Sequence, residues 1–529
     1  MKKTELGKGV SENADAKGSG MDKGSNMDNI VSVAKRRGFI FPSAEIYGGM
    51  SGFYDYGPLG TKLKNKIENS WRESFIGENM WEISSRTVVP EAVWQASGHL
   101  KDFVDPIIQC EKCKSMFRAD HLVEDSTKIF VEGMKPQQLA ELVEENKIKC
   151  PKCKGKLGEV KVFNLMLKTN VGPVESSGGV AYLRPETAQG IFTNFKNILV
   201  STRARLPFGV AQLGISYRNE ISPRQWIIRL REFNQAEIEM FIHPQRLDEC
   251  PEFAEVARKR IKVLTREGQK EGRDAEEMTA EEAVERGIIP NKWMGYFIAK
   301  ELEWYRGLGI PPEALRHRHM LETETPHYSR GNFDMEIKFD FGWKEVVGNA
   351  YRTDFDLKAH TEHSGEDLSI AEGSEKIVPH VVEPSFGIDR TVYAILLYCF
   401  REGKNKGGRD WDWFAFPPKI APYAAAVFPL VNKDGLPEKA KEVYRQLKQC
   451  YDACYDESGS IGKRYARNDE IGSFLSVTID HQTLEDDTVT IRSRDTTKQI
   501  RVEIKDLINV IWKLVNEEAE FEKAGKPVR

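Results

Sequence analysis

Apolar residues recur at helical spacing in the N-terminal part of the chain. Between residues 59 and 75 they stand four positions apart, and lysine and arginine fill several of the positions between them. The apolar positions are Leu59, Leu63, Ile67, Trp71 and Phe75. This pattern predicts a helix that buries one face. A β-leaning run over residues 81–89 follows and ends at Pro90, which suits a strand end because proline donates no ladder hydrogen bond.

Two segments of alternating apolar and polar residues predict an antiparallel hairpin. They cover residues 210–219 and 226–242 and are joined by a short, mainly polar turn. Strand-like runs resume at residues 334–341 and 345–347. An apolar helix is expected to follow, opening within residues 383–390.

Two stretches divide this pattern. Residues 245–330 are dense in charge and have helical periodicity, so we expect a helical insertion that lies outside the sheet. Residues 402–410 are polar and contain glycine, and Pro417 and Pro418 follow, which is typical of a linker. After Lys419 strands and helices alternate, and this alternation predicts a small α/β domain.

Composition limits the class of protein. With 529 residues the chain is too long for one packed core, and about three domains are expected. Apolar residues make up 40% and charged residues 30%, which excludes wholesale disorder, collagen-like repeats and a disulfide scaffold. The formal net charge is −4, so a nucleic-acid partner would meet local basic patches, and a histone-like role is excluded.

The N-terminal segment is not expected to direct export. Residues 1–28 are rich in glycine, serine, lysine and aspartate and lack an apolar stretch that could form a signal-peptide core. We interpret them as a disordered, solvated tail. No window reaches the roughly 18 consecutive apolar residues that a membrane helix needs. The sequence therefore predicts a cytoplasmic protein with no membrane partner.

Eight cysteines in a cytoplasmic chain argue against structural disulfides. Four of them form two Cys-x-x-Cys pairs, at Cys110, Cys113, Cys150 and Cys153. Four thiolates from two tight turns are the ligand set of a closed, structural zinc site. The 36 residues between the pairs exceed the usual spacing of about 15–20, and residues 134–146 within them predict a short helix. A module that works without metal, or keeps only some of the ligands, is the alternative.

One set of residues suited to chemistry lies at the hairpin bend. Arg218, Asn219 and Glu220 stand at the turn, and Arg229 and Phe233 follow on the returning segment. Arginine can pair bidentately with phosphate, an aromatic face can pack on a purine, and a carboxylate can accept from an exocyclic amine. The alternative is a surface hairpin with ordinary ion pairs.

A second set lies where the apolar helix opens. Glu383 and Ser385 precede a glycine, and Arg390 follows, so polar groups gather at the electropositive end of the helix. That arrangement suits a triphosphate. The alternative is that Pro384 and Ser385 only cap the helix.

Three further acids, Glu186, Glu237 and Glu345, stand apart from these sets. Strand alternation places Glu237 on the face opposite Ala236 and Ile238, and by itself it predicts a solvent-facing side chain.

Together these residues resemble the motifs of the class II aminoacyl-tRNA synthetases, and most closely those of the dimeric glycyl-tRNA synthetases. The helix and strand that end at Pro90 look like motif 1, residues 217–233 like motif 2, and residues 383–390 like motif 3, in the family's order. Markers typical of the glycyl type stand at residues 97–99, 118–122 and 182–190. The resemblance covers about residues 30–529.

The resemblance implies an α+β fold, in which a class II antiparallel sheet is flanked by helices. It implies a catalytic domain over residues 29–415, an α/β anticodon-binding domain over residues 416–529, and a tail over residues 1–28. Within the catalytic domain, a zinc-binding-like insertion with four cysteines is expected over residues 105–160 and the helical insertion over residues 245–330.

The resemblance also implies the activity of a glycine-tRNA ligase. Glycine would be activated with ATP and Mg²⁺ to glycyl-adenylate, and the glycyl group would then pass to the 3′-terminal adenosine of tRNA(Gly). The expected partners are glycine, ATP, tRNA(Gly) and a second copy of the chain, with residues 59–90 forming part of the homodimer interface. The alternatives are a non-catalytic, synthetase-like nucleic-acid-binding subunit, and a synthetase for serine, threonine or proline, which conflicts with the glycyl-type markers.

Position by position, the resemblance implies an ATP site. Arg218 would bind the α-phosphate, Glu220 the adenine amine, and Phe233 would stack on the ring. Arg390 would hold the distal phosphates, and Glu345 would bind magnesium, which takes oxygen ligands. The implied ATP-site residues are Arg218, Asn219, Glu220, Arg229, Leu230, Phe233, Glu345, Val346 and Arg390, of which Arg218, Glu220 and Arg390 are the catalytic candidates.

A glycine pocket is implied in the same way, with carboxylates that pair with the substrate ammonium group. The matching residues are Arg118, Glu186, Glu237, Glu383, Pro384 and Ser385.

A last cluster lies in the C-terminal domain and mixes charge with an aromatic ring, a combination that single-stranded RNA favours. It consists of Lys463, Arg464, Tyr465 and Arg467. By itself such a cluster is usually only surface.

Overall fold

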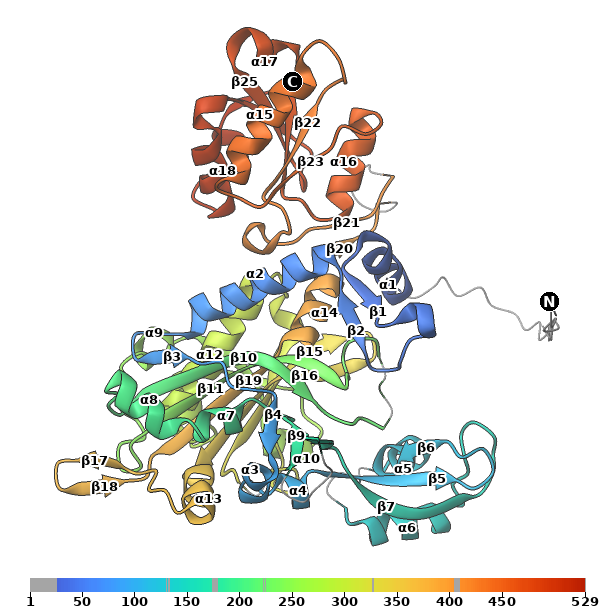
Figure 1. The fold of residues 1–529 in the computed structure, drawn as a ribbon, viewed down its shortest axis with the longest axis vertical. Helices are drawn as coiled ribbons and strands as arrows, with labels where there is room; N and C mark the ends of the chain where they lie inside the picture. Colours follow the sequence, from blue (N-terminus) through green and yellow to red (C-terminus); the bar gives the residue numbers. More distant parts are fainter. Residues whose placement is uncertain are drawn as a thin grey trace.

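The computed structural model describes residues 26–129, 131, 134–173, 179–221, 223, 225–325, 328–403 and 410–528. In this part of the chain a nine-stranded sheet forms the body of the molecule (Figure 1). A small four-cysteine module projects from one side of the body, and a second α/β domain lies at the other end of the long axis (Figure 1). No described helix is long and apolar enough to cross a membrane.

A tail was expected over residues 1–28. Residues 1–25 of this segment lie outside the described part of the chain. The last three residues of the expected tail belong instead to helix α1 (Asn26–Arg37). Ile30, Val33 and Ala34 of this helix are buried in the main core, so the ordered chain begins slightly earlier than the composition indicated.

The large sheet is mostly antiparallel, as the fold class predicted; only the β3–β10 and β12–β14 pairs are parallel. Its order is β13 (Glu276–Thr279), β12 (Arg260–Leu264), β14 (Leu315–His319), β15 (Asn332–Phe339), β16 (Gly342–Thr353), β19 (His380–Gly387), β11 (Glu232–Ile242), β10 (Phe208–Tyr217) and β3 (Met80–Glu82). The predicted hairpin is confirmed, because β10 pairs with β11 along its full length.

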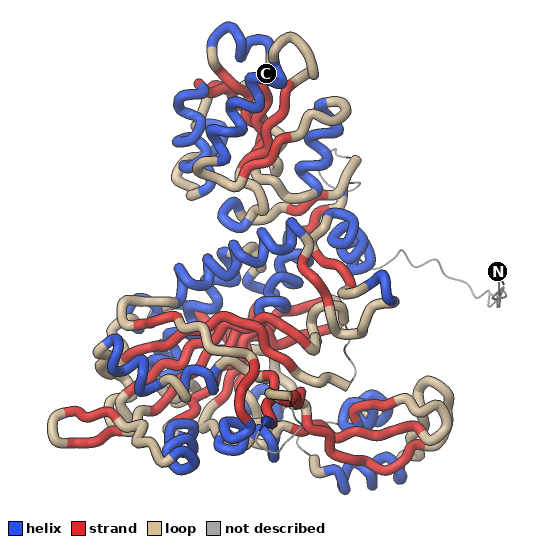
Figure 2. Tube along the Cα trace, in the orientation of Figure 1, coloured by secondary structure: helices blue, strands red, loops and turns tan. Residues whose placement is uncertain are grey.

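Three long helices cover one face of the sheet: α2 (Pro58–Phe75), α12 (Lys292–Gly307) and α14 (Ile388–Cys399) (Figures 1 and 2). The apolar stripe predicted for α2 is buried throughout. Trp71 and Phe75 at the end of this stripe pack against Phe386 of β19, with ring centroids 5.8 and 4.8 Å away. These two aromatic side chains therefore belong to the core of the chain itself.

Shorter helices cover the other face. They are α7 (Ala188–Phe192), α8 (Phe195–Thr202) and α13 (Phe355–Ser364). Phe195 of α8 packs on Phe241 of β11 with centroids 4.9 Å apart, and Phe208 of β10 lies equally close to Phe241. Helices cover both faces of the sheet. The alternating side chains of β11 therefore point into two buried regions, and neither set faces solvent.

The expected helical insertion over residues 245–330 is wrong in part. Helix α12 lies where helical periodicity indicated it, but β12, β13 and β14 extend the edge of the large sheet. In β12, Ile261 and Val263 are buried while Arg260 and Lys262 are charged, so the first four residues alternate with a period of two. The high density of charge concealed this short strand pattern.

The same segment contains several short helices besides α12. They are α9 (Phe253–Val256), α10 (Arg266–Lys270), α11 (Ala280–Glu285) and the 3-10 turn η3 (Pro312–Ala314).

The β-leaning run at residues 81–89 forms two strands in two different sheets. Its first part is β3 of the large sheet, and its end is β4 (Val88–Pro90), which pairs with β9 (Val180–Leu183). Strand β8 (Leu167–Asn170) completes this second sheet.

The body contains several further short elements. They are η1 (Glu45–Tyr47), α3 (Glu91–Ala96), α4 (His99–Asp102) and the strand pairs β1 (Ile40–Pro42) with β2 (Tyr54–Tyr56), β17 (Ile370–Glu372) with β18 (Glu375–Ile377), and β20 (Phe400–Arg401) with β21 (Trp413–Phe414).

The four-cysteine module has a small core of its own, built around Ile108, Phe117 and Leu139. It consists of β5 (Val104–Cys110), β6 (Met116–Arg118), α5 (Ala119–Thr127), α6 (Pro136–Glu145) and β7 (Leu157–Asn164). Helix α6 confirms the short helix that was predicted between the two cysteine pairs.

The C-terminal domain is the α/β unit that the sequence predicted, with a separate apolar core. Its six-stranded sheet has the order β23 (Ala453–Tyr455), β22 (Ala425–Pro429), β24 (Leu475–Ile479), β25 (Thr488–Ser493), β26 (Gln499–Glu503) and β27 (Lys526–Pro527). Its helices are η5 (Pro418–Ile420), α15 (Leu436–Lys448), α16 (Ile461–Glu470), α17 (His481–Asp486), η6 (Ile504–Asp506), α18 (Leu507–Val515) and η7 (Phe521–Lys523).

Three members of the charged and aromatic cluster make contacts within the C-terminal domain. The buried guanidinium of Arg464 donates to the backbone carbonyls of Pro429, Glu457 and Gly459. Tyr465 shares a hydrogen bond with Thr478, and Arg467 pairs with Asp456. Charged side chains on a short helix looked like surface in the sequence, but these three connect α16 to β22, to β24 and to the loop after β23.

Candidate active site

The chemically active side chains gather on one face of β11, β16 and β19, the face opposite α2, α12 and α14. Glu237 of β11 lies directly across from Ser385 of β19 in the strand register. Their apolar neighbours Ile238 and Phe386 point into the main core. The alternation of this strand was therefore interpreted correctly, but the expectation of a solvent-facing Glu237 is wrong, because helices and Arg352 cover its face.

A cavity of about 110 Å³ opens beside these strands. It brings together eight of the nine residues implied for ATP: Arg218, Glu220, Arg229, Leu230, Phe233, Glu345, Val346 and Arg390. Asn219 is not among its lining residues; its backbone N–H donates to the carbonyl of Leu165 at 2.8 Å. The cavity also reaches Gln235 and Ser385, the two residues that join it to the acidic cluster described below.

Arg218 is held between two aromatic rings at the side of this cavity. Its guanidinium carbon lies 5.2 Å from the ring centroid of Phe233 and 5.3 Å from that of Phe103. Its Nε donates to the carbonyl of Pro185 at 3.3 Å. Two cation–π contacts restrict the position of the guanidinium before any anion is bound.

Glu220 is a buried acid beside the same cavity. Among the described residues its Oε2 atom has no hydrogen-bond partner, and the nearest cation is Arg229, whose Nε lies 3.7 Å away. A buried acceptor of this kind is suited to an N–H donor from a ligand, because leaving it unsatisfied is costly.

Arg390 connects three segments at the far end of the cavity. Its Nη1 donates to the backbone carbonyl and to the carboxylate of Glu345 at 2.8 and 3.0 Å, and its Nε donates to the carbonyl of Ile228 at 3.1 Å. Burial opposes ionisation of Glu345, but Arg390 and Arg218 outweigh it and lower the pKa of this carboxyl. Glu345 therefore presents an ionised carboxylate, which suits a divalent cation.

The first turn of α14, which carries Arg390, is fixed by the buried carboxylate of Asp389. This group accepts from the backbone N–H of Asn234 at 2.5 Å, from its side-chain amide at 3.1 Å, and from the hydroxyl of Tyr56. Glu383 and Ser385 lie on β19, and the N-cap residue of α14 is Gly387, with no side-chain cap. The alternative in which Pro384 and Ser385 only cap the helix is therefore wrong.

Beyond Ser385 lies a cluster of five buried carboxylates. Its members are Glu186, Glu237, Glu239, Asp356 and Glu383. Glu237 accepts from the backbone N–H of Thr187 at 2.7 Å and from its hydroxyl. It also accepts from Ser385 Oγ at 2.6 Å and from Gln235 Nε2 at 2.9 Å. With both oxygens bonded, this side chain has one fixed orientation.

Arg352 is the cation at the centre of the cluster, and the sequence analysis did not single it out. It binds Asp356 at 2.7 and 2.9 Å and Glu383 at 2.8 Å, and it reaches Glu186 at 3.9 Å. It is the extra residue of a β-bulge, since Tyr351 and Thr353 pair with the consecutive residues Val382 and Val381. A bulge redirects a side chain, and no alternation pattern marks one in advance.

The remaining acids of the cluster differ in their charge. Burial opposes ionisation of Glu186, but the nearby His99 and Arg352 outweigh it and lower the pKa of this group. Burial raises the pKa of Glu383 to about 8 despite Arg352, because Glu237 and Glu186 are close. Acids outnumber the one central arginine, so the cluster is suited to a small cation such as an ammonium group.

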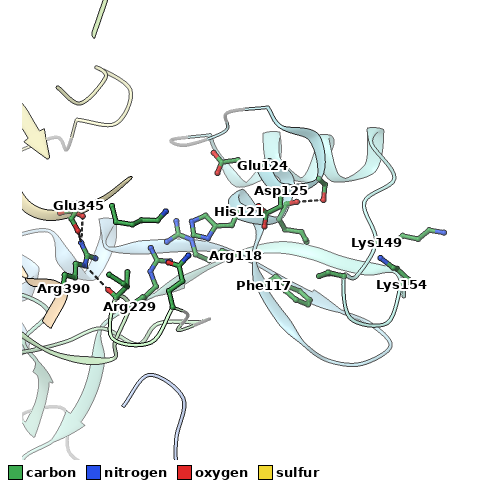
Figure 3. Close-up of a pocket in the computed structure, with 16 residues that line it drawn as sticks. Phe117, Arg118, His121, Glu124, Asp125, Lys149, Lys154, Arg229, Glu345 and Arg390 are labelled. Carbon is green, nitrogen blue, oxygen red and sulfur yellow. Dashed lines mark hydrogen bonds and ion pairs between the residues drawn. The ribbon is translucent and has the colours of Figure 1, made fainter. Parts of the chain in front are cut away.

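Arg118 does not belong to this cluster in the structure. It pairs with Asp105 at 3.0 Å and with Asp120 at 2.5 Å. It lines an outer cavity of about 650 Å³ together with Arg229 and Arg390 (Figure 3). Its role in a glycine pocket stays a prediction that its contacts do not favour.

The four cysteines of the module converge as their spacing predicted. All four sulfurs lie within 4.8 Å of one another, with Cys110 and Cys153 3.5 Å apart and Cys113 and Cys150 3.6 Å apart. Tetrahedral zinc with Zn–S bonds of about 2.3 Å requires sulfurs about 3.8 Å apart. The donor set and its spacing therefore fit zinc.

The two turns that carry these cysteines have the same geometry. Lys114 and Lys154 both adopt φ of +58°, and their N–H groups donate to the carbonyls of Cys110 and Cys150 at 3.0 and 2.8 Å. Two identical turns that face each other form a closed ligand set, which is typical of a structural site.

Comparison with known proteins agrees with this geometry. A model of the class II core domain of tRNA synthetases (G, H, P, S and T) matches residues 174–398, and a model of an anticodon binding domain matches residues 424–514. The chain is 40% identical to a glycine–tRNA ligase of Methanothrix thermoacetophila over 95% of this chain and 99% of the relative.

Two further relatives carry the same name. The glycine–tRNA ligase of Methanothermobacter thermautotrophicus is 41% identical over 92% of this chain and 99% of its own length. That of Pyrococcus horikoshii is 42% identical over 92% of this chain and 98% of its own length.

At pH 5, the Glu239→Gln variant is expected to have the same melting temperature as the wild type. At pH 8, its melting temperature should be higher than that of the wild type. Burial raises the pKa of Glu239 well above its usual value, and Glu383, Glu237 and Asp356 add to this effect while Arg352 opposes it. The folded protein therefore keeps a proton that the unfolded chain releases, so stability is lost as the pH rises above the unfolded pKa. Glutamine resembles the neutral acid and does not titrate.

Melting curves followed by circular dichroism at the two pH values check this prediction. Glu255→Gln, at an exposed acid of α9, is the control and should behave as the wild type at both. A variant that melts at a lower temperature than the wild type at both pH values would contradict the prediction. It would show that Glu239 is ionised in the folded protein and is stabilised by Arg352.

Proposed function

The chain belongs to the glycine–tRNA ligases, a family of class II aminoacyl-tRNA synthetases, and from this premise we propose how its residues activate glycine and join it to tRNA. The observation that carries the proposal is the junction of two sites at Ser385 and Gln235. Both residues line the cavity that holds the residues implied for ATP, and both donate to Glu237 of the acidic cluster. An ammonium group in the cluster and a phosphate in the cavity would meet at this junction.

In the proposed arrangement, ATP lies along the cavity with its adenine against Phe233. Glu220 accepts from the adenine amine, Arg218 binds the α-phosphate, and Arg390 holds the distal phosphates. Glu345 would hold a magnesium ion, which would supply charge neutralisation for the phosphates when bound. Arg229, Leu230 and Val346 complete the walls of the cavity.

The first half-reaction needs no protein nucleophile. A carboxylate oxygen of glycine forms a bond to the α-phosphorus of ATP, the bond from this phosphorus to the bridging oxygen breaks, and pyrophosphate leaves with the electron pair. Glu186, Glu237 and Glu383 hold the ammonium group, so they orient the carboxylate toward Arg218. Positioning and charge stabilisation supply the acceleration.

The second half-reaction transfers the glycyl group to the terminal ribose hydroxyl of tRNA, and AMP leaves. The C-terminal domain, which matches an anticodon-binding family, is proposed to hold the other end of the tRNA.

Selection of glycine follows from size. No smaller amino acid exists, so a crowded pocket rejects competitors by steric overlap, which typically costs about 1–3 kcal/mol and more in a rigid site. The orientation of Glu237, fixed by four donors, provides such rigidity.

Arg218→Ala is expected to lower the rate of glycine-dependent ATP–pyrophosphate exchange by about 100- to 1,000-fold, because it removes charge stabilisation at the α-phosphate. Glu237→Gln should instead raise the KM for glycine by about 10- to 100-fold, because it removes a charged hydrogen-bond acceptor. The exchange assay, run with each of the twenty amino acids, measures both effects.

The control is Arg258→Ala, at an exposed arginine that lines neither cavity, and it should keep wild-type rates. Circular dichroism spectra of the variants should match the wild type. Exchange that is stimulated best by an amino acid other than glycine would contradict the substrate, and loss of tRNA affinity alone in both variants would contradict the residue roles.

We propose that Cys110, Cys113, Cys150 and Cys153 hold one structural zinc ion. The support is their mutual distance and their two identical turns. Elemental analysis should find about one zinc per chain in the wild type and none after Cys113→Ser with Cys150→Ser, with a lower melting temperature. Cys450→Ser, at an exposed cysteine outside the module, should retain the metal. Metal-free wild-type protein with undiminished heat stability would contradict this proposal.

We also propose a homodimer. Since Trp71 and Phe75 are buried in the core, the support comes from the 3-10 turn η1 after β1, where Ile46 and Tyr47 are 89% and 87% exposed. Neighbouring exposed apolar side chains favour contact with a partner surface.

Sedimentation is expected to give twice the 60.3 kDa chain mass for the wild type. Ile46→Asp combined with Tyr47→Ser should give a monomer. Val200→Asp changes an exposed apolar residue elsewhere, on α8, and should leave the dimer intact. A fully active wild-type monomer at micromolar concentration would contradict the proposal.

A further inference from the structure

The outer cavity continues the nucleotide cavity at its phosphate end. The two cavities share Ile228, Arg229, Glu345 and Arg390 as lining residues, and the space widens from about 110 Å³ to about 650 Å³ beyond them. Arg390 is the residue proposed above to hold the distal phosphates. A group that leaves the α-phosphorus in the direction of Arg390 therefore enters the outer cavity.

Basic side chains dominate the walls of this outer cavity. Its cationic and imidazole groups are Arg118, His121, Lys149, Lys154, Arg229, Lys344 and Arg390, against the acids Glu124, Asp125 and Glu345. Arg118, Arg229 and Arg390 are paired with carboxylates. Lys344, Lys149 and Lys154 form no ion pair with any described residue. The excess of positive charge selects a compact polyanion.

The walls come from two different parts of the chain. Arg118 and His121 belong to the four-cysteine module, whereas Lys344 follows the turn between β15 and β16 and directly precedes Glu345. Figure 3 shows Arg118 and His121 extending from the module toward Arg229 and the Glu345–Arg390 pair. The module thus supplies one side of a site whose other side is the phosphate end of the nucleotide cavity.

We propose that this outer cavity is a pyrophosphate site, in which His121 and Lys344 bind the leaving group between the four-cysteine module and the catalytic body. The inference rests on the proposed function, because adenylate formation is the step that releases pyrophosphate. The bond from the α-phosphorus to the bridging oxygen breaks, and the pyrophosphate carries its electron pair into the cavity. The same site receives pyrophosphate in the reverse reaction.

The reverse reaction tests the proposal directly. The variant His121→Gln with Lys344→Ala is compared with the wild type in glycine-dependent ATP–pyrophosphate exchange, with pyrophosphate varied at saturating glycine and ATP. The KM for pyrophosphate is expected to rise about tenfold, because two donors to a phosphate are lost in a solvent-accessible cavity. The KM for glycine should stay within about twofold. Lys344→Arg alone, which keeps the charge, should stay close to the wild type.

Lys161→Ala is the matched control, since Lys161 is an exposed lysine of β7 in the same module and does not line the cavity. It should leave the KM for pyrophosphate unchanged. An unchanged KM for pyrophosphate in the double variant would overturn the proposal. If the KM for tRNA in aminoacylation rose instead, the cavity would hold phosphates of the RNA backbone. A wild-type protein without any glycine-dependent exchange would overturn the proposed function itself, which separates the two failures.

Discussion

The guanidinium of Arg352 is the positive charge around which five buried carboxylates are arranged. It binds Asp356 and Glu383 directly and reaches Glu186, while Glu237 and Glu239 lie on β11, on the other side of β19. Without a central cation, so many acids in one buried region would repel one another and would all have to be neutral. With it, part of the cluster stays ionised, and the surplus of acids is available to a small cationic substrate.

The position of Arg352 depends in turn on the large sheet. The bulge at Arg352 interrupts the β16–β19 pairing, and the apolar sides of β11, β16 and β19 are held by α2, α12 and α14. Asp389 adds a polar connection between β2, β11 and the first turn of α14. The arginine proposed to hold the distal phosphates and the acids proposed to hold glycine are therefore positioned by one continuous core.

The two peripheral units are attached close to this core. The four-cysteine module brings Arg118 and His121 to the cavity beside Arg390. The C-terminal domain is joined to helix α1 by Arg36 and Arg37, which both pair with Glu470 of α16, and α1 is buried in the same core as α14. The module beside the proposed phosphate site and the domain proposed to bind tRNA are thus both in contact with the body that contains the central sheet.

The sequence by itself determined those features that depend on neighbouring residues. The four-residue spacing in α2, the alternation in β10 and β11, and the two Cys-x-x-Cys turns each predicted a local geometry that the structure has. Motif order predicted which residues line the nucleotide cavity, with Asn219 as the exception.

Only the tertiary structure decided what covers each surface. Alternation placed Glu237 on the correct side of its strand but could not reveal the helices and Arg352 beyond it. Charged residues concealed β12, and the guanidinium of Arg464 binds the carbonyl of Pro429, which is 35 residues away in the chain. Burial, charge pairing and the redirection of a side chain by a bulge depend on contacts between distant segments, and a local pattern contains no information about such contacts.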